Sequence, residues 1–280
     1  MTNTLWIASA LIAPLLAGAG AATAAQTVSI ERAVARVTVI LEPRGDVEAV
    51  MTRANARFPI RIERTADGVA IRGDLQFSPA SCRGSAERPR VSVWMRGSVG
   101  ADDMPQIVVR APLSAAVRAE GAVYGAVGRG DNLVLANAGC GDWTVGDQTG
   151  ALDISVTGSG NVRAGAAGRA DLRVAGSGDV ALRLARAGLS AAVTGSGDID
   201  VGEVDGPLHA KVAGSGNVRV KGGTVSDMGV SVVGSGDVSF GGVAARLDAH
   251  VAGSGDISVA KVTGAVSKHV AGSGDVSVGH

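Results

Sequence analysis

The sequence predicts an all-β protein, a parallel β-helix with rungs of about 19 residues and a β-rich region at its N-terminal end. Two observations carry this prediction. Apolar and polar residues alternate at period two along most of the second half of the chain, which is typical of strands. In addition, Gly-Ser-Gly followed by Asp or Asn recurs at steps of 18 to 20 residues, which indicates one small unit repeated along an axis. The copies begin at Gly158, Gly176, Gly195, Gly214, Gly234, Gly253 and Gly272.

The residues around each copy indicate which side chains are buried. The residue two before the first glycine is Val in every copy, from Val156 to Val270, and the residue four after it is Val or Ile. Each repeat is therefore predicted to be two short strands around a glycine corner. One unit cannot cover its own apolar face, so the units are expected to stack about 4.8 Å apart and pair their backbones. A hairpin within each unit is the alternative that this pattern leaves open.

The N-terminal part of the chain divides into two predicted regions. Residues 1–24 are an apolar run in which Ala22 and Ala24 form an A-x-A cleavage pattern, which predicts a signal peptide. Residues 25–112 contain strand patterns but no Gly-Ser-Gly copy, and they are expected to form either a small antiparallel cap or the first irregular rungs. Residues 113–280 are assigned to the β-helix, whose last rung is expected to expose a strand edge that allows self-association.

Composition excludes several classes of function. Lys plus Arg equal Asp plus Glu at 26 each, and aromatic residues are only 2% of the chain. No basic cluster is interleaved with aromatic residues, so a nucleic-acid partner is not expected. No segment after the signal peptide is long and apolar enough to predict a membrane span. The sequence therefore predicts a periplasmic or secreted protein of a bacterial envelope, with a protein or glycan partner.

Several stretches together resemble one known family. They are VSIERAVARVTVILEPRGDVEAV, RAPLSAAVRAEGAVYGAVG, NAGCGDW and the Gly-Ser-Gly-Asp-Val repeats, which together take in most of the chain after the signal peptide. They resemble the putative auto-transporter adhesin, head GIN domain family. The resemblance implies a right-handed parallel β-helix in an envelope protein, with a role in adhesion and no assigned catalytic residues or cofactor.

The residue after each Gly-Ser-Gly is the first candidate for chemistry. Stacking of the rungs would place these Asp and Asn side chains in one column. Capping of the turn by the side-chain oxygen is the favoured interpretation, and calcium binding by stacked carboxylates is the alternative, which would make the protein a calcium-dependent assembly module. The calcium hypothesis concerns Asp179, Asp198, Asp237, Asp256 and Asp275.

Three further features have alternative interpretations. Cys82 and Cys140 are the only cysteines, and an even number in an exported chain favours a disulfide over two free thiols. His250 and His269 fall on consecutive rungs as a candidate metal pair, although surface histidines without metal are favoured. A carbohydrate-active enzyme of the polysaccharide lyase type is the alternative function. It is disfavoured because a catalytic group would break the repeat pattern locally, whereas the aspartates recur in nearly every rung.

Overall fold

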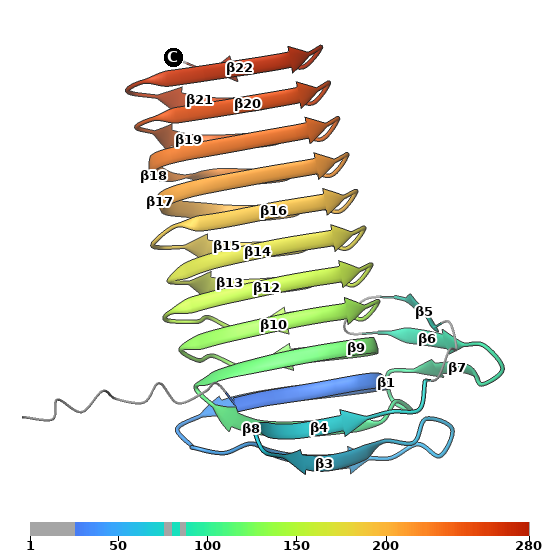
Figure 1. Cartoon of the computed structure of the whole chain (residues 1–280). Coiled ribbons are helices and arrows are strands. Elements are labelled where there is room, and N and C mark those ends of the chain that lie inside the picture. The colour runs from blue at the N-terminus through green and yellow to red at the C-terminus, as the bar shows by residue number, and fades with distance from the viewer. Residues whose placement is uncertain (1–25, 76–79, 85–87, 280) are drawn as a thin grey trace, which may run out of the picture.

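The computed structural model describes residues 26–75, 80–84 and 88–279. The predicted signal peptide and His280 lie outside these described residues. Every described element is a strand. The strands wind into a long solenoid with two sheets, here called the front sheet, which is nearer the viewer in Figure 1, and the back sheet.

Strand bounds follow the repeat. The front sheet contains β4 (Gly68–Arg72), β10 (Asn132–Gly139), β12 (Ala151–Gly158), β14 (Arg169–Gly176), β16 (Leu189–Gly195), β20 (Leu247–Gly253) and β22 (Val266–Gly272). The back sheet contains β8 (Gln106–Pro112), β11 (Trp143–Val145), β13 (Val162–Ala167), β15 (Val180–Ala185), β19 (Val238–Ala244), β21 (Ile257–Val262) and β23 (Val276–Val278). Four longer strands contribute to both sheets, namely β1 (Gln26–Glu42), β9 (Ser114–Val127), β17 (Ile199–Gly214) and β18 (Val218–Gly234).

The predicted parallel β-helix is confirmed. Successive front strands pair in parallel without a shift in register, so that Val156, Val174, Val193 and Val212 stack in one column. The hairpin alternative is wrong, because the two strands of a repeat lie in different sheets. In Figure 1 the front strands run from left to right while the chain climbs, which makes the helix right-handed.

The Gly-Ser-Gly corner brings the backbones of neighbouring rungs unusually close. Gly195 has a φ of 121°, which L side chains rarely adopt. The carbonyl oxygen of Gly176 in the preceding rung accepts hydrogen bonds from the N–H groups of both Ser196 and Gly197, at 2.9 and 3.1 Å. A Cβ at Gly197 would lie 2.1 Å from the oxygen of Gly178. Glycine is therefore required twice in each corner, once for φ and once for space.

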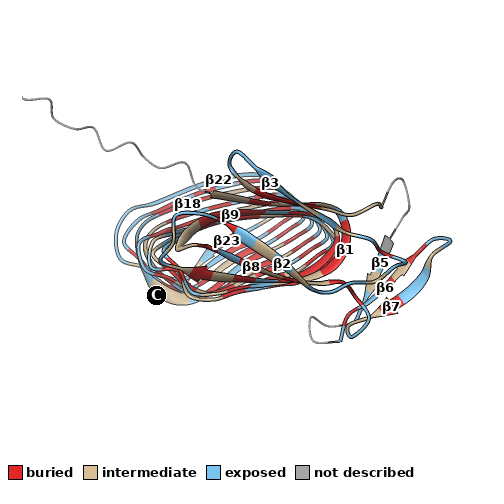
Figure 2. Cartoon of the chain, turned by 90° about the horizontal axis from the view of Figure 1, so that it is seen from below, coloured by how far each residue is buried: buried red, intermediate tan, exposed pale blue. Residues whose placement is uncertain are grey.

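The inward columns form one continuous apolar core along the axis, visible as the buried interior in Figure 2. Trp143 is the largest side chain that is fully buried. Its ring occupies the space in which a Cβ of Gly125 would stand, only 2.2 Å from the ring. Packing of Trp143 in the core thus requires glycine at position 125 in the rung below.

The N-terminal strand is inserted between rungs that come later in the chain. β1 pairs in parallel with β4 and β8 on one side and with β9 on the other, and Figure 1 shows it between them. It turns the corner without glycine, since Arg32 adopts a φ of 49°. β2 (Glu48–Arg53) and β3 (Arg61–Thr65) then pair antiparallel with β8 and β4. The described strands before β9 thus include both parallel rungs and antiparallel strands.

A second small sheet projects from the corner. Its strands β5 (Ala80–Arg83), β6 (Arg90–Val93) and β7 (Gly97–Gly100) are antiparallel. We call the described residues between β4 and β8, namely 73–75, 80–84 and 88–105, the ear; Figures 1 and 2 show its sheet beside the solenoid. A cluster of buried side chains that includes Val91, Met104 and Tyr124 joins the ear to the outside of the corner.

Candidate functional site

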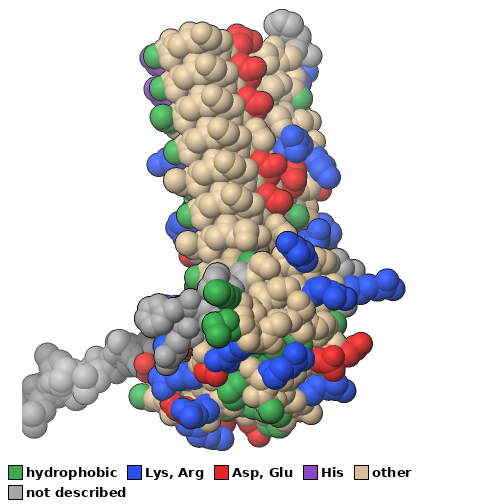
Figure 3. All heavy atoms as spheres, turned by 90° about the vertical axis from the view of Figure 1, so that its right-hand side faces the viewer, with side chains coloured by type: hydrophobic (Ala, Val, Ile, Leu, Met, Phe, Trp, Pro, Cys, Tyr) green, Lys and Arg blue, Asp and Glu red, His purple; other side chains and the backbone are tan. Residues whose placement is uncertain are grey.

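The corner aspartates form a hydrogen-bonded column along the edge of the solenoid. In each rung the side-chain Oδ1 accepts a hydrogen bond from the backbone N–H of the equivalent residue in the next rung. Examples are the bonds from Asp198 to Asp179 and from Asp256 to Asp237, at 2.9 and 2.8 Å. We call this set the Asp column, and its acidic residues line the face shown in Figure 3. Its members are Asp142, Asn161, Asp179, Asp198, Asn217, Asp237, Asp256 and Asp275.

The two asparagines in the column reduce its charge and add a bond. Asn161 Nδ2 donates to Asp142 Oδ1 at 3.0 Å, and Asn217 Nδ2 donates to Asp198 Oδ1 at 2.9 Å. The Oδ1 atom of each bonded residue therefore links its own rung to the next one. The calcium hypothesis for the five upper aspartates stays a prediction.

The two cysteines are joined. Cys82 on β5 and Cys140 at the first clear corner form a disulfide with a Cα–Cα distance of 5.7 Å across 58 residues of sequence. Cys140 stands where the other corners carry serine. The bond attaches the ear to the solenoid at the corner.

The Asp column ends in a different set of residues at the foot of the ear. Backbone pairing places Gln106, Arg36, Tyr124 and Asp142 on successive rungs, so Tyr124 occupies the position of the column aspartate. These side chains line a hollow of about 320 Å³ on the outer side of the back sheet. We call it the ear pocket. Thr144 also lines it.

The electrostatics of the ear pocket differ from those of the rest of the column. Tyr124 is buried, and burial raises the pKa of its phenol to about 12, with the negative charge of Asp142 as a second, smaller cause. The phenol is thus neutral at any ordinary pH. The pocket combines this hydroxyl with the guanidinium of Arg36 and the carboxylate of Asp142. Such a mixture of polar groups in a hollow suits a hydroxyl-rich or peptide ligand.

The sequence patterns did not indicate the ear pocket. The available signal was the aromatic residue in the GAVYGAV stretch, one step before the first clear corner, where the repeat would place Asp or Asn. Arg36 could not be found in this way because β1 joins the column out of sequence order.

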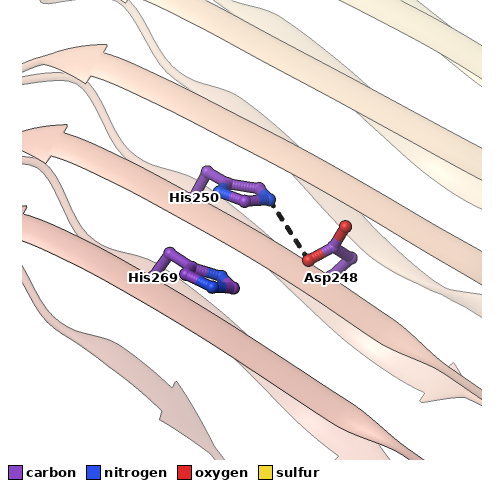
Figure 4. A group of neighbouring side chains, drawn as sticks. All are labelled: Asp248, His250 and His269. Carbon is purple, nitrogen blue, oxygen red and sulfur yellow. Dashed lines mark ion pairs between the residues drawn. The ribbon is translucent and has the colours of Figure 1, made fainter.

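A second cluster lies on the outer side of the front sheet. His250 on β20 and His269 on β22 are paired in register, and their rings are stacked with centroids 4.8 Å apart and planes inclined by 9°. This places them side by side, as the sequence predicted. Asp248 faces His250, with 3.3 Å between its Oδ1 and the Nε2 of the imidazole. Figure 4 shows the three exposed side chains together; the sequence had not indicated Asp248.

Acidic and basic side chains on the lower front sheet are joined as ion pairs. Arg173 contacts Asp153 at 3.2 Å and Asp171 at 2.7 Å. Burial raises the pKa of Asp171, against the opposing effect of Arg173. The guanidinium of Arg173 thus balances the charge of both carboxylates.

Comparison with known proteins finds a family that matches part of the chain. Residues 96–224 match the family described as "Putative auto-transporter adhesin, head GIN domain". The chain is thus similar to this family over these residues, which is the family that the sequence resembles. The matched segment runs from the ear to β18 and is narrower than the stretches that suggested the resemblance. Among curated proteins no significant match is found.

Two solved structures resemble this protein. One is a putative adhesin from Parabacteroides distasonis, with a TM-score of 0.58 and 16% identity over 91% of this chain and 92% of that one. The other is a putative adhesin from Bacteroides fragilis, with a TM-score of 0.46 and 13% identity over the same shares. At this identity the first likeness supports the fold alone. None of the described residues forms a helix able to cross a membrane.

Proposed function

We propose that this protein is a non-catalytic, adhesin-like protein of the bacterial envelope that binds a protein or glycan partner through the ear pocket. The observation that carries the proposal is the break in the Asp column. Above the pocket, each column side chain links two rungs. At the pocket, Arg36 and Tyr124 replace the aspartate and border a hollow. A binding site is expected where a repeat protein departs locally from its repeat.

A bulky substitution on the rim of the pocket tests this proposal. Ala126 is exposed, lines the pocket and pairs in register with Thr144, and the same outward column continues through Arg163 to Ala181. Ala126→Trp should fill the hollow, whereas Ala181→Trp places the same ring on the same outward column two rungs beyond Thr144. We expect Ala126→Trp to lose binding to immobilised envelope extract and Ala181→Trp to retain it. Equal binding by both variants would refute the pocket.

Treatment of the extract distinguishes the two classes of partner. Protease treatment should abolish binding if the partner is a protein, and periodate oxidation should abolish it if the partner is a glycan. Release of shortened polysaccharide during the same incubation would instead support the carbohydrate-active alternative. The proposal of a non-catalytic role is supported by the column carboxylates, whose Oδ1 atoms bind backbone N–H groups.

Export to the envelope is part of the proposal. The A-x-A pattern at Ala22 and Ala24 and the disulfide both fit an exported chain, because disulfides persist in oxidising compartments. Sequencing of the N-terminus of the protein from the cell envelope should give a chain that begins near Ala25. A chain that retains Met1 and is found in the cytosol would contradict export.

Self-association through the last described rung is also proposed. Val266 and Val270 on β22 are 42% and 46% exposed, although Leu247 and Val251 in the same columns are 1% and 3% exposed. A rung from a second copy would cover them. Light scattering should show a mass that rises with concentration, and Val270→Lys should reduce it. A constant monomer mass for the unmodified protein would refute this association.

A further inference from the structure

The geometry points to a surface site for a zinc ion formed by Asp248, His250 and His269, on the opposite sheet from the ear pocket and independent of it. Each residue offers one ligand atom, and the three atoms lie within 4.8 Å of one another. Two imidazoles and a carboxylate are a ligand set that Zn²⁺ accepts, with water at the fourth position.

The distances favour a four-coordinate ion. Bonds of about 2.0–2.1 Å in a tetrahedron place neighbouring ligand atoms roughly 3.3 Å apart. Asp248 Oδ1 and His250 Nε2 are already separated by 3.3 Å. His269 must bring one nitrogen closer by about 1.5 Å or less to reach the same separation. Its side chain is exposed, so rotation about its own bonds can supply this movement without a change in the backbone.

The backbone fixes the relative positions of the ligands. His250 and His269 are direct neighbours in a parallel pair, and Asp248 lies two residues before His250 on the same face of β20. β20 is held in place by its inward side chains Leu247, Ala249 and Val251, which are buried. Two of the three ligands therefore need no reorganisation, which lowers the entropic cost of binding an ion.

Asp248 differs from the aspartates of the Asp column in what it contacts. The column aspartates use Oδ1 to accept a backbone N–H from the next rung. Asp248 instead directs its carboxylate at the imidazole of His250, as Figure 4 shows. Lys268, the residue before His269, donates from its Nζ to the carbonyl of Val276 at 2.7 Å and so is directed at another strand. A cation at the site would be attracted by the negative charge of Asp248.

Calorimetric titration with zinc chloride tests the site on the tag-free mature protein. We expect one zinc ion per chain, and we expect His250→Ala, His269→Ala and Asp248→Asn each to weaken the affinity by about tenfold or more. The matched control is His209→Ala. His209 is on the same sheet face and shares a column with Asp248, but two rungs away across Gly229. This control should bind zinc as the unmodified protein does.

A structural readout separates this site from zinc bound elsewhere. Because the ion would link β20 to β22, zinc should slow hydrogen exchange at residues 266–272 in the unmodified protein and leave it unchanged in His269→Ala. The proposal is overturned if the protein takes up no zinc, if the three variants bind as tightly as the unmodified protein, or if His209→Ala loses binding equally. It is also overturned if zinc binds without slowing exchange in β22.

Discussion

The backbone angle and the space around the Cα decide which glycines of this fold can be replaced by residues with a side chain. At the first corner glycine both the backbone angle and the space exclude a side chain. Gly214 has a φ of 131°, and an added Cβ would lie 2.4 Å from the oxygen of Gly195. Gly222 lies only eight residues further along the chain. There an added Cβ would meet nothing within 4 Å.

These two glycines provide a matched test of the corner. We expect Gly214→Ala to lower the free energy of unfolding by about 2–4 kcal/mol, as the sum of backbone strain and overpacking. Gly222→Ala should change it by less than about 0.5 kcal/mol. Denaturant unfolding followed by circular dichroism measures both. Similar stability of the two variants would show that the corner tolerates a side chain.

Tyr124 gives a pH-dependent test at the same scale. Its folded pKa of about 12 is above the ordinary value of 10.0, so the folded state holds the phenolic proton more tightly than the unfolded state does. The resulting stability is fully present below pH 10 and is lost as the pH rises through 12. A shift of two units corresponds to about 2–3 kcal/mol. Tyr124→Phe should abolish this loss between pH 10 and 12.

The measurement is simple because Tyr124 is the only tyrosine in the chain. The ultraviolet absorbance of phenolate therefore reports this residue alone. Its midpoint in the folded protein should be near 12, and it should return to about 10 in denaturant. A midpoint near 10 in the folded protein would mean that the phenol is in contact with water.

At the scale of elements, the Asp column links each rung to the next, and the disulfide links the ear to the solenoid. Asp237 accepts the N–H of Asp256 at 2.8 Å and donates its own N–H to Asn217 at 3.0 Å. The natural occurrence of Asn in the column shows that the oxygen, not the charge, is the requirement. The column is thus a set of caps between rungs.

Substitution of Asp237 separates capping from calcium binding. Asp237→Asn keeps the acceptor oxygen and should leave stability within about 0.5 kcal/mol, whereas Asp237→Ala should cost about 1 kcal/mol. Melting curves with and without calcium complete the test. A rise in melting temperature with calcium that is lost in Asp237→Asn would instead support the calcium hypothesis.

The disulfide should stabilise the ear end of the molecule more than the repeats. Closing a loop of 58 residues contributes about 4 kcal/mol in the chain-entropy estimate. We expect the double variant Cys82→Ser with Cys140→Ser to increase hydrogen exchange in β6 and β7. Exchange in β16 should stay unchanged, and Ser159→Ala, a change at the next corner, is the control. Unchanged exchange in β6 would show that the ear is held by its apolar contacts alone.

Residue patterns predicted the solenoid well and the ear pocket poorly, for identifiable physical reasons. A Val that recurs at the same place in every repeat is explained by stacking of equivalent residues on one another. The column from Val156 to Val270 therefore predicted the register between rungs. The position of β1 has no such signal, because the partners of Val37 are Ile107 and Gly125, which are distant in sequence. The ear pocket depends on that insertion. Asp248 was missed although its position two residues before His250 on one strand already places both side chains on the same face.

At the scale of the whole molecule, the solenoid is a one-dimensional stack in which each rung contacts mainly its neighbours. Stability in such a stack is a sum of rung and interface contributions. A destabilising core substitution near one end should therefore unfold only the rungs at that end. The same substitution near the middle should leave two folded segments separated by unfolded rungs. β2 and β3 cover the edges of β8 and β4 at one end of the solenoid, and β22 is exposed near the other end of the described residues.

The insertion of β1 also sets the order in which a growing chain can fold. Residues 26–42 leave the ribosome before their partners in β4, β8 and β9. β1 is paired along both of its edges only once β9 has emerged, after which we expect each further 19 residues to add onto a finished template. Arrested chains that end at residue 112 should be digested by protease, and chains that extend beyond residue 167 should resist. Synthesis thus runs from one end of the chain, while folding waits for its first complete turn.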